Sequence, residues 1–198
     1  MRSANPFRNP VFFITMIFFG VIWAISLAAI ISCSQPPPQP VALGLPPAAT
    51  QLGVYSIRSY GAVPDDGVDD TVAIDAAIDA AEAYTAANAQ SRAVVYMPRG
   101  VYQETGVSIV GSRVTVEGPG ELKLTGTSGS AAIFVESTAR DIMVRDIAIN
   151  GNNSGSASAG NGVLVQGQRV RLDNLTVRNT KDHSIAASYP CRHVTIER

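Results

Sequence analysis

The sequence has little of several features that would narrow its function at once. Only two of its 198 residues are cysteine, so the chain has no framework of disulfide bonds. Neither sign of charge dominates, because 15 Lys and Arg residues stand against 16 Asp and Glu, which gives a formal net charge of −1. This balance gives no indication of nucleic-acid binding or of attraction to a strongly anionic surface. The residues from 53 onward are numerous enough for one domain with its own core.

The N-terminal region has the layout of an export signal. Arg2 and Arg8 precede an apolar run over residues 11–31, and Ser32 and Cys33 follow it. The letters IISC resemble a bacterial lipoprotein signal, which implies that Cys33 carries a lipid as the first residue of the mature chain. The run is also long enough to cross a bilayer uncleaved, so a signal anchor is an alternative, and a buried core helix is a third.

A proline-rich tract separates this region from the rest of the chain. Residues 34–52 contain SQPPPQP and LPPAA, which predict an extended and semi-rigid spacer without a packed core. The predicted organisation is therefore a signal or anchor at 1–33, a linker at 34–52 and one domain at 53–198. We expect the domain to be exported and held on a membrane, at the surface or in the periplasm of a bacterium.

The stretch from Ser59 to Ala83 predicts a turn followed by a helix. It reads SYGAVPDDGVDDTVAIDAAIDAAEA, in which a glycine turn and a cluster of acids precede an alanine-rich segment. Asp69 or Asp70 is expected to cap the first amides of the helix, and the acids favour the positive end of its dipole. Apolar residues recur at helical spacing and would form one narrow stripe, which should pack against other elements. These residues are Ile74, Ala77, Ile78 and Ala81.

After this helix the sequence repeats with the period-2 pattern of short strands. The segments RVTVEG, DIMVRDIAING, RVRLDNLTVRN and HVTIER align, with offsets of 142 − 114 = 28, 170 − 142 = 28 and 194 − 170 = 24 between their first aliphatic residues, which are Val114, Ile142, Val170 and Val194. A second series, AIFVES, GVLVQG and SIAAS, is interleaved with the first and aligns Ile133, Val163 and Ile185. Interleaved strand repeats without intervening helices predict an all-β parallel β-helix.

The repeats predict which side chains form the core of this coil. The residues expected to point inward are Val114, Val116, Ile142, Val144, Ile147, Ile149, Val170, Leu172, Leu175, Val177, Val194 and Ile196. A β-helix leaves its first and last turns open, so it needs a cap, and the predicted helix suits the N-terminal end. At the other end Arg198 follows core-type residues directly, and we expect that the sequence is a fragment or that another chain covers this end.

Together these segments resemble the start of the pectate-lyase-like superfamily of right-handed parallel β-helices. The resemblance rests on YGAVPDDGVDDTVAIDAAIDAA, on AVVYMPRGVY and on the glycine-punctuated repeats, and it covers about residues 54–198. It implies a structural role, as turn and helix cap, for Asp66, Gly67, Asp70 and Thr71. The superfamily includes polygalacturonase-type hydrolases, pectate lyases, mannuronan epimerases and phage tailspike-like depolymerases. The resemblance is specific for the fold and weakly so for the activity.

The acids near the start of the helix also suggest a calcium loop, because hard cations bind several carboxylates at once. Their spacing does not follow the alternating ligand pattern of an EF-hand, and capping accounts for at least two of them, so we favour a structural role for Asp65, Asp66, Asp69 and Asp70. Cys191, His183 and His193 are too isolated to predict a metal site. No cofactor is predicted; Ca²⁺ would be expected only if the protein were a lyase.

The string NTKDHS is the candidate site. It follows one repeat and precedes the next strand, where a bend would place polar side chains on an outer groove. Asp182 would be a general acid or base and His183 a proton carrier, while Arg178 and Lys181 would bind a uronate carboxylate. The string resembles the NTDG motif of polygalacturonase-type hydrolases, which implies a catalytic Asp182, but Lys181 is inserted and His183 replaces the glycine.

These observations lead to a hypothesis with two alternatives. The leading hypothesis is an exported, membrane-tethered β-helix protein that acts on an acidic polysaccharide as a lyase, hydrolase or epimerase. The first alternative is a non-catalytic module for glycan binding or adhesion, and the second is an inactive N-terminal part of a longer enzyme. The partners expected are a polysaccharide and a membrane, and no nucleic acid.

Overall fold

The computed structural model describes residues 53–125, 131–152 and 160–198, so Cys33 and the predicted signal and linker lie outside the described residues. The described helices are η1 (Ile57–Tyr60), a 3₁₀ helix, and α3 (Thr71–Ala87). The strands are β1 (Val54–Ser56), β2 (Ala93–Tyr96), β3 (Gly100–Glu104), β4 (Val107–Ile109), β5 (Val114–Glu117), β6 (Gly120–Leu124), β7 (Ala131–Val135), β8 (Arg140–Arg145), β9 (Ala148–Asn150), β10 (Asn161–Val165), β11 (Gln168–Asp173), β12 (Thr176–Arg178), β13 (His183–Ala187) and β14 (Arg192–Glu197).

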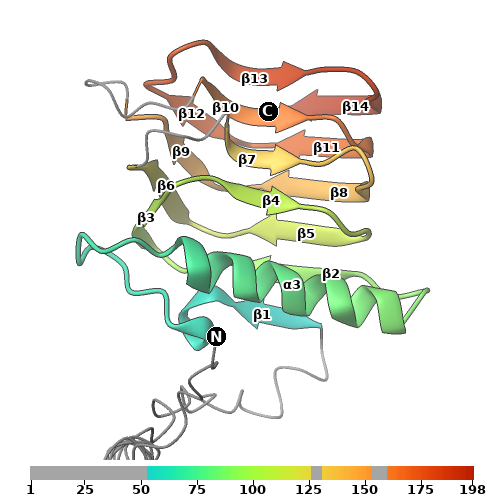
Figure 1. Ribbon diagram of the computed structural model, residues 1–198, viewed down its shortest axis with the longest axis horizontal. Helices are drawn as coiled ribbons and strands as arrows, with labels where there is room; N and C mark the ends of the chain where they lie inside the picture. The colour runs from blue at the N-terminus through green and yellow to red at the C-terminus, as the bar shows by residue number, and fades with distance from the viewer. Residues whose placement is uncertain (1–52, 126–130, 153–159) are drawn as a thin grey trace, which may run out of the picture. The chain divides into compact units, whose positions relative to one another are not determined.

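The strands form three parallel sheets that together make a coil (Figure 1). Sheet A has the order β1-β2-β5-β8-β11-β14, sheet B has β3-β6-β9-β12, and sheet C has β4-β7-β10-β13. The chain visits one strand of each sheet in turn, for example β5, β6 and β7, and then begins the next turn with β8. The predicted all-β parallel β-helix with one helix near its start is confirmed.

The strand register agrees with the two aligned series. In sheet A, Val170 lies opposite Ile142 on one side and Val194 on the other. In sheet C, Val163 lies opposite both Ile133 and Ile185. Sheet B forms a third ladder that the sequence did not separate from the first. Its strands β9 and β12 have three residues each, too few to show an alternation of their own.

Most of the predicted inward residues form the core. Those from Val114 to Leu172 are at most 3% exposed. Leu175, Val177 and Val194 are only partly buried and pack against this core. The prediction is wrong for Ile196, which is 58% exposed. Its strand β14 is paired only with β11, so no described strand covers its other side.

Bends between the sheets use backbone conformations that L-residues rarely adopt. The residue just before the first aligned aliphatic of each sheet A segment has positive φ, and these residues are Arg113, Asp141, Arg169 and His193. Asn174 also has positive φ, a conformation that asparagine tolerates, as does Asp146 one turn earlier. The Asn174 Nδ2 donates to Asp146 Oδ1 at 2.7 Å. Bend residues in successive turns therefore stack and bond along the coil.

Charged side chains form a second ladder on the outside of sheet A. Arg169 donates from Nε and Nη2 to the two carboxylate oxygens of Asp141, at 2.6 and 2.7 Å. This hydrogen bond lowers the pKa of Asp141 below its ordinary value. Arg145 contacts a single oxygen of Glu117, one turn away, with its Nε and Nη2 at 2.6 and 2.5 Å from Oε2. These pairs are exposed to solvent, which screens them, so each adds little to the stability of the coil.

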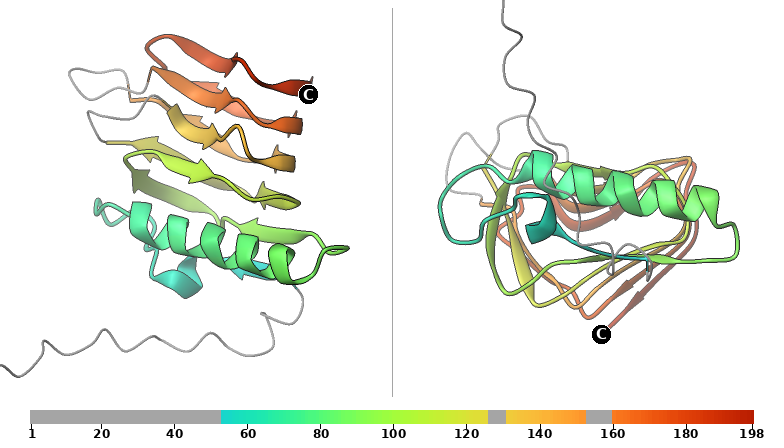
Figure 2. Two further views of the ribbon diagram at one scale, coloured as in Figure 1. Left: turned by 45° about the vertical axis from the view of Figure 1, so that its right-hand side comes forward. Right: turned by 90° about the horizontal axis from the view of Figure 1, so that it is seen from below.

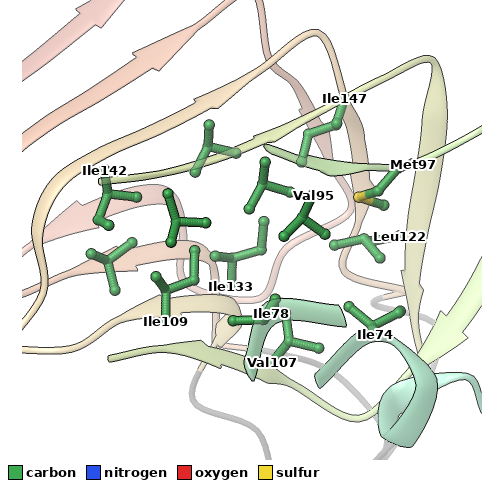
Figure 3. Close-up of a cluster of buried hydrophobic side chains, with 14 of the residues drawn as sticks. Ile74, Ile78, Val95, Met97, Val107, Ile109, Leu122, Ile133, Ile142 and Ile147 are labelled. Carbon is green, nitrogen blue, oxygen red and sulfur yellow. The ribbon is translucent and has the colours of Figure 1, made fainter. Parts of the chain in front are cut away.

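Helix α3 covers the N-terminal end of the coil. Seen along the coil from its N-terminal end, α3 forms one side of the first turn, in line with the strands of sheet C (Figure 2). Its predicted apolar stripe is buried, with Ile74, Ala77, Ile78 and Ala81 at most 2% exposed. Ile74 and Ile78 point toward Val107 and the coil interior (Figure 3). The predicted apolar stripe therefore packs on the first turn of the coil.

Three sets of hydrogen bonds hold the ends of α3 in place. At the start, Asp69 Oδ1 accepts from the Thr71 amide, whereas Asp70 occupies the N-cap position without a side-chain bond to the helix. Near the end, Glu82 Oε1 accepts from the amides of Val110 and Gly111 at 2.8 Å. Arg113 donates to the carbonyl oxygens of Thr85 and Ser91, which adds a positive charge at the negative end of the helix dipole. The helix is therefore fixed to the coil by polar as well as apolar contacts.

Within the described residues, no helix combines the length and the apolar character that a membrane span requires.

The buried stripe of α3 yields a prediction about stability. Replacing Ile78 by alanine should lower the free energy of unfolding by about 2–5 kcal/mol, because a fully buried aliphatic side chain is lost and a cavity remains. Val72→Ala is the matched control, since Val72 lies on the same helix at 82% exposure, and its effect should stay within about 0.5 kcal/mol. Urea unfolding followed by circular dichroism measures both. Equal effects of the two substitutions would contradict the assigned packing face.

Candidate functional site

The structure places the predicted site residues at the bend between β12 and β13, where the chain passes from sheet B to sheet C. The amides of Asp182 and His183 both donate to the carbonyl oxygen of Gly160, at 2.6 and 3.2 Å. The side chains of Lys181, Asp182 and His183 are exposed. The bend is therefore anchored through its backbone to the preceding turn and leaves three polar side chains facing solvent.

The preceding turn fixes the shape of this bend. Asn179 has a φ of 53°, and its Nδ2 donates to Asn150 Oδ1 at 3.0 Å. The Gly151 amide donates to the carbonyl oxygen of Arg178 at 2.9 Å. A Cβ atom on Gly151 would lie only 2.6 Å from the Asn179 carbonyl oxygen, so glycine is needed for this close approach. The position of Asp182 thus depends on residues about 30 positions earlier in the chain.

Arg178 already has a carboxylate partner within the chain. Its Nη2 donates to Glu121 Oε1 and Oε2 at 2.8 and 2.7 Å, across two turns of the coil. Asn150 Nδ2 also donates to Glu121 Oε1, at 3.2 Å. In the register of sheet B, Ala148 lies between Glu121 and Thr176, and Asn150 lies opposite Arg178. Arg178, predicted to bind a uronate, is therefore already bound to a carboxylate on the outer face of sheet B.

Lys181 and Asp182 are differently placed. Within the part of the chain that the structure describes, neither side chain makes a hydrogen bond or ion pair. Both are free to meet a ligand from solvent. Asp182 can act as an acid or base, His183 beside it can carry a proton, and Lys181 can attract an anionic group. The bend therefore presents three reactive groups to solvent.

The sequence did not identify Glu121 and Asn150 as parts of this site. Both lie on the outer face of sheet B, and each bonds to a residue of the bend or to its flanking arginine. A signal was present in the repeat, because Asn150 and Asn179 are 29 positions apart, close to the 28-residue offset of sheet A. The ion pair between Glu121 and Arg178 spans two turns, so comparing each repeat with the next one along the sequence does not reveal it.

The acidic side chains before α3 accept hydrogen bonds from backbone amides. Each of the four carboxylates accepts a hydrogen bond from a main-chain amide: Asp65 from Val101, Asp66 from Val68, Asp69 from Thr71 and Asp70 from Val63. Among the described residues, no group of three or more His, Cys, Asp or Glu side chains is arranged to hold a metal ion. These carboxylates therefore organise the turn through hydrogen bonds to its backbone.

Part of the chain matches a known protein family, and its fold is similar to those of solved structures. Residues 54–124 match a family described as rhamnogalacturonase A/epimerase, pectate lyase-like. No curated protein matches the sequence. ORF18 of Geobacillus virus E2 is 22% identical with a TM-score of 0.57, and the match covers 70% of this chain and 28% of that one.

A second solved structure with the same fold is the A-module of the Azotobacter vinelandii mannuronan C-5 epimerase AlgE6. It is 24% identical with a TM-score of 0.52, and the match covers 67% of this chain and 41% of that one. The chain thus spans less than half the length of either solved structure. Because both identities are below 25%, they inform on the fold alone. The sheet order, the register and these comparisons together show that this chain has a pectate-lyase-like parallel β-helix fold.

Proposed function

We propose that the protein is exported, tethered to a membrane, and acts on an acidic polysaccharide at the bend that carries Asp182. The observation that supports this most directly is the exposed, unpaired carboxylate of Asp182 beside His183 and Lys181, on a backbone fixed by the preceding turn. The fold adds support, because its family description and one similar structure concern epimerases, and that structure's enzyme acts on mannuronan.

The exposed groups suit chemistry on a uronate. A base that removes the proton next to a uronate carboxylate starts both elimination and epimerisation, and an acid that protonates a glycosidic oxygen starts hydrolysis. Asp182 fills one of these roles, His183 relays the proton, and Lys181 pairs with the substrate carboxylate. Arg178 contributes only when a uronate competes with Glu121 for its guanidinium, which is half exposed.

A second candidate is a glycan-binding module without catalysis. It is favoured by the departure from the NTDG pattern, since Lys181 precedes Asp182 and His183 follows it. It is also favoured by the Glu121 partner that Arg178 already has. The third candidate is a piece of a longer enzyme that is inactive alone. It is favoured by the coverage of the two similar structures, of which the matches span 28% and 41%.

The catalytic proposal predicts the effect of one substitution. With polygalacturonate or alginate in the presence of calcium, Asp182→Asn should reduce turnover by about 10²–10⁴-fold, because an amide cannot transfer the proton. Unsaturated products that absorb in the near ultraviolet report elimination, and new reducing ends without that absorbance report hydrolysis. Nuclear magnetic resonance of the polymer reports epimerisation.

Asp79→Asn is the control for this substitution, because Asp79 is an exposed acid on α3, at the N-terminal end of the coil. Its turnover should equal that of the unchanged protein. Turnover that Asp182→Asn leaves intact would remove Asp182 from the proposal. No turnover with either polymer, together with retained binding on a glycan array, would favour the binding module.

The proposed tether predicts a processing event. In a bacterial host, Cys33→Ser should leave the precursor unprocessed and without lipid, because the serine hydroxyl cannot replace the thiol that accepts the lipid. Gel migration and labelling with a fatty-acid analogue measure this, and Cys191→Ser serves as the matched control. Unchanged migration and membrane association of Cys33→Ser would support an uncleaved spanning anchor in its place.

A further inference from the structure

A buried carboxyl group lies inside the first turn of the coil. Glu104, at the end of β3, has no exposed surface. The Gly106 amide donates to its Oε2, while Oε1 has no hydrogen-bond partner among the described residues. It points to the same side as the buried Tyr102 and lies opposite Leu124 in the register. Such a group favours its neutral form, and burial raises the pKa of Glu104 to about 8.

The chain segment 63–71, here called the strap, lies at the edge of sheet B. It runs beside β3 and leads into the first residue of α3 (Figure 1). The amides of Asp65 and Asp70 donate to the carbonyl oxygens of Val101 and Gln103, at 2.9 and 2.7 Å. The strap therefore acts as an edge strand for β3 and joins the coil to its helical cap.

A side-chain contact continues these strap bonds past the end of β3. The Thr105 amide donates to Thr71 Oγ1 at 2.8 Å, and the Thr71 and Thr105 hydroxyl groups are 3.1 Å apart. Glu104 immediately precedes Thr105, so any shift of the Glu104 backbone acts directly on this contact.

The two charged groups that act on Glu104 are both acidic. Asp69 of the strap and Asp75 of α3 both raise its pKa. On β6, the inward residues are the apolar Leu122 and Leu124, while Glu121 and Lys123 are only partly buried on the outer face. On β4, Val107 and Ile109 are apolar and Ser108 is neutral.

The nearest cation on η1 is already engaged. Arg58 donates from Nε to the Tyr102 hydroxyl group at 3.1 Å and from Nη2 to the Arg99 carbonyl oxygen. It pairs with no carboxylate within the described residues. An ionised Glu104 would therefore be repelled by two carboxylates, and no positive charge among the described residues offsets this repulsion.

The strap contains a second carboxyl group of this kind. Asp70 is 5% exposed, its Oδ1 accepts from the Val63 amide, and its Oδ2 has no partner among the described residues. Burial raises the pKa of Asp70, and the charges of Asp66 and Asp69 raise it further, while its backbone hydrogen bonds lower it. Two half-satisfied carboxyl groups thus lie on either side of the contact between the strap and β3.

We propose that this contact is a proton-controlled latch at the N-terminal end of the coil. While Glu104 carries its proton, the strap stays paired with β3 and α3 stays seated. When Glu104 ionises, repulsion by Asp69 and Asp75 and the lack of a partner for Oε1 drive the carboxylate toward water. That movement separates β3 from the strap and loosens the cap. The inference stands apart from the proposed polysaccharide activity.

The direction of the pH dependence follows from proton linkage. Glu104 holds its proton more tightly in the closed state than in the opened state, where its ordinary pKa of 4.5 applies. The stabilisation is complete below pH 4.5 and is lost as the pH rises to about 8. Within this window, opening should increase by up to about tenfold per pH unit, and it should level off above it.

Hydrogen exchange of the full-length chain in detergent tests the latch. The chain is labelled at several pH values from 5 to 9, with labelling times corrected for the intrinsic rate, and peptides that contain residues 63–71 and 100–106 are followed by mass spectrometry. Opening in these two peptides should rise with pH, whereas peptides from β8 and β11 should not change. Glu104→Gln keeps the shape but cannot ionise, so most of the rise should disappear in this variant.

Two further variants keep the result interpretable. Asp70→Asn should remove only part of the rise, and Asp146→Asn, an exposed bend residue, should remove none. If Glu104→Gln does not fold, the rise in the unchanged protein and its dependence on Asp70 still test the latch. A flat profile in the unchanged protein would overturn the proposal, and so would an equal rise in a folded Glu104→Gln variant.

Discussion

The structure depends on one constraint: inward aliphatic side chains must lie in the same register in every turn. Val170 meets Ile142 and Val194 in sheet A, and Val163 meets Ile133 and Ile185 in sheet C. A shift of one residue would turn these side chains outward, because alternate residues of a strand face opposite sides. The register therefore fixes the bends, and the bends fix the outer polar ladders. Even the exposed bend at Asp182 takes its shape from the turn beneath it.

The same constraint makes the first turn the most demanding part of the coil. A stack of strands has no turn before its first, so apolar groups and strand edges there require other partners. Helix α3 covers the apolar end with Ile74 and Ile78, and the segment 63–71 pairs with the edge of β3. Glu104 lies where these elements meet and is buried with one oxygen unpaired. An acidic residue at a junction that otherwise excludes water makes the stability of that junction depend on pH.

The candidate site shows how far a repeat can be used to predict contacts. Lys181, Asp182 and His183 lie together because they are consecutive, and their exposure follows from the bend. The partner of Arg178 could not be found in the same way. Glu121 is 57 positions earlier, and the contact exists because the arginine side chain extends across two turns of the coil. Cross-turn contacts of long side chains depend on rotamers as well as on register, and only the register is written in the repeat.

The sequence by itself determined the parallel β-helix, the two main registers, the apolar face of α3 and the place of the candidate bend. These follow from local periodicity, since each turn repeats the pattern of the one before. The tertiary structure alone decided the exposure of Ile196, the pairing of Arg178 with Glu121, the turn of Asp70 away from the helix it precedes, and the burial of Glu104. Each of these depends on which neighbour lies across a turn or at an end of the coil. An alternating pattern gives the direction of a side chain, but the water or protein that meets it is set by packing in three dimensions.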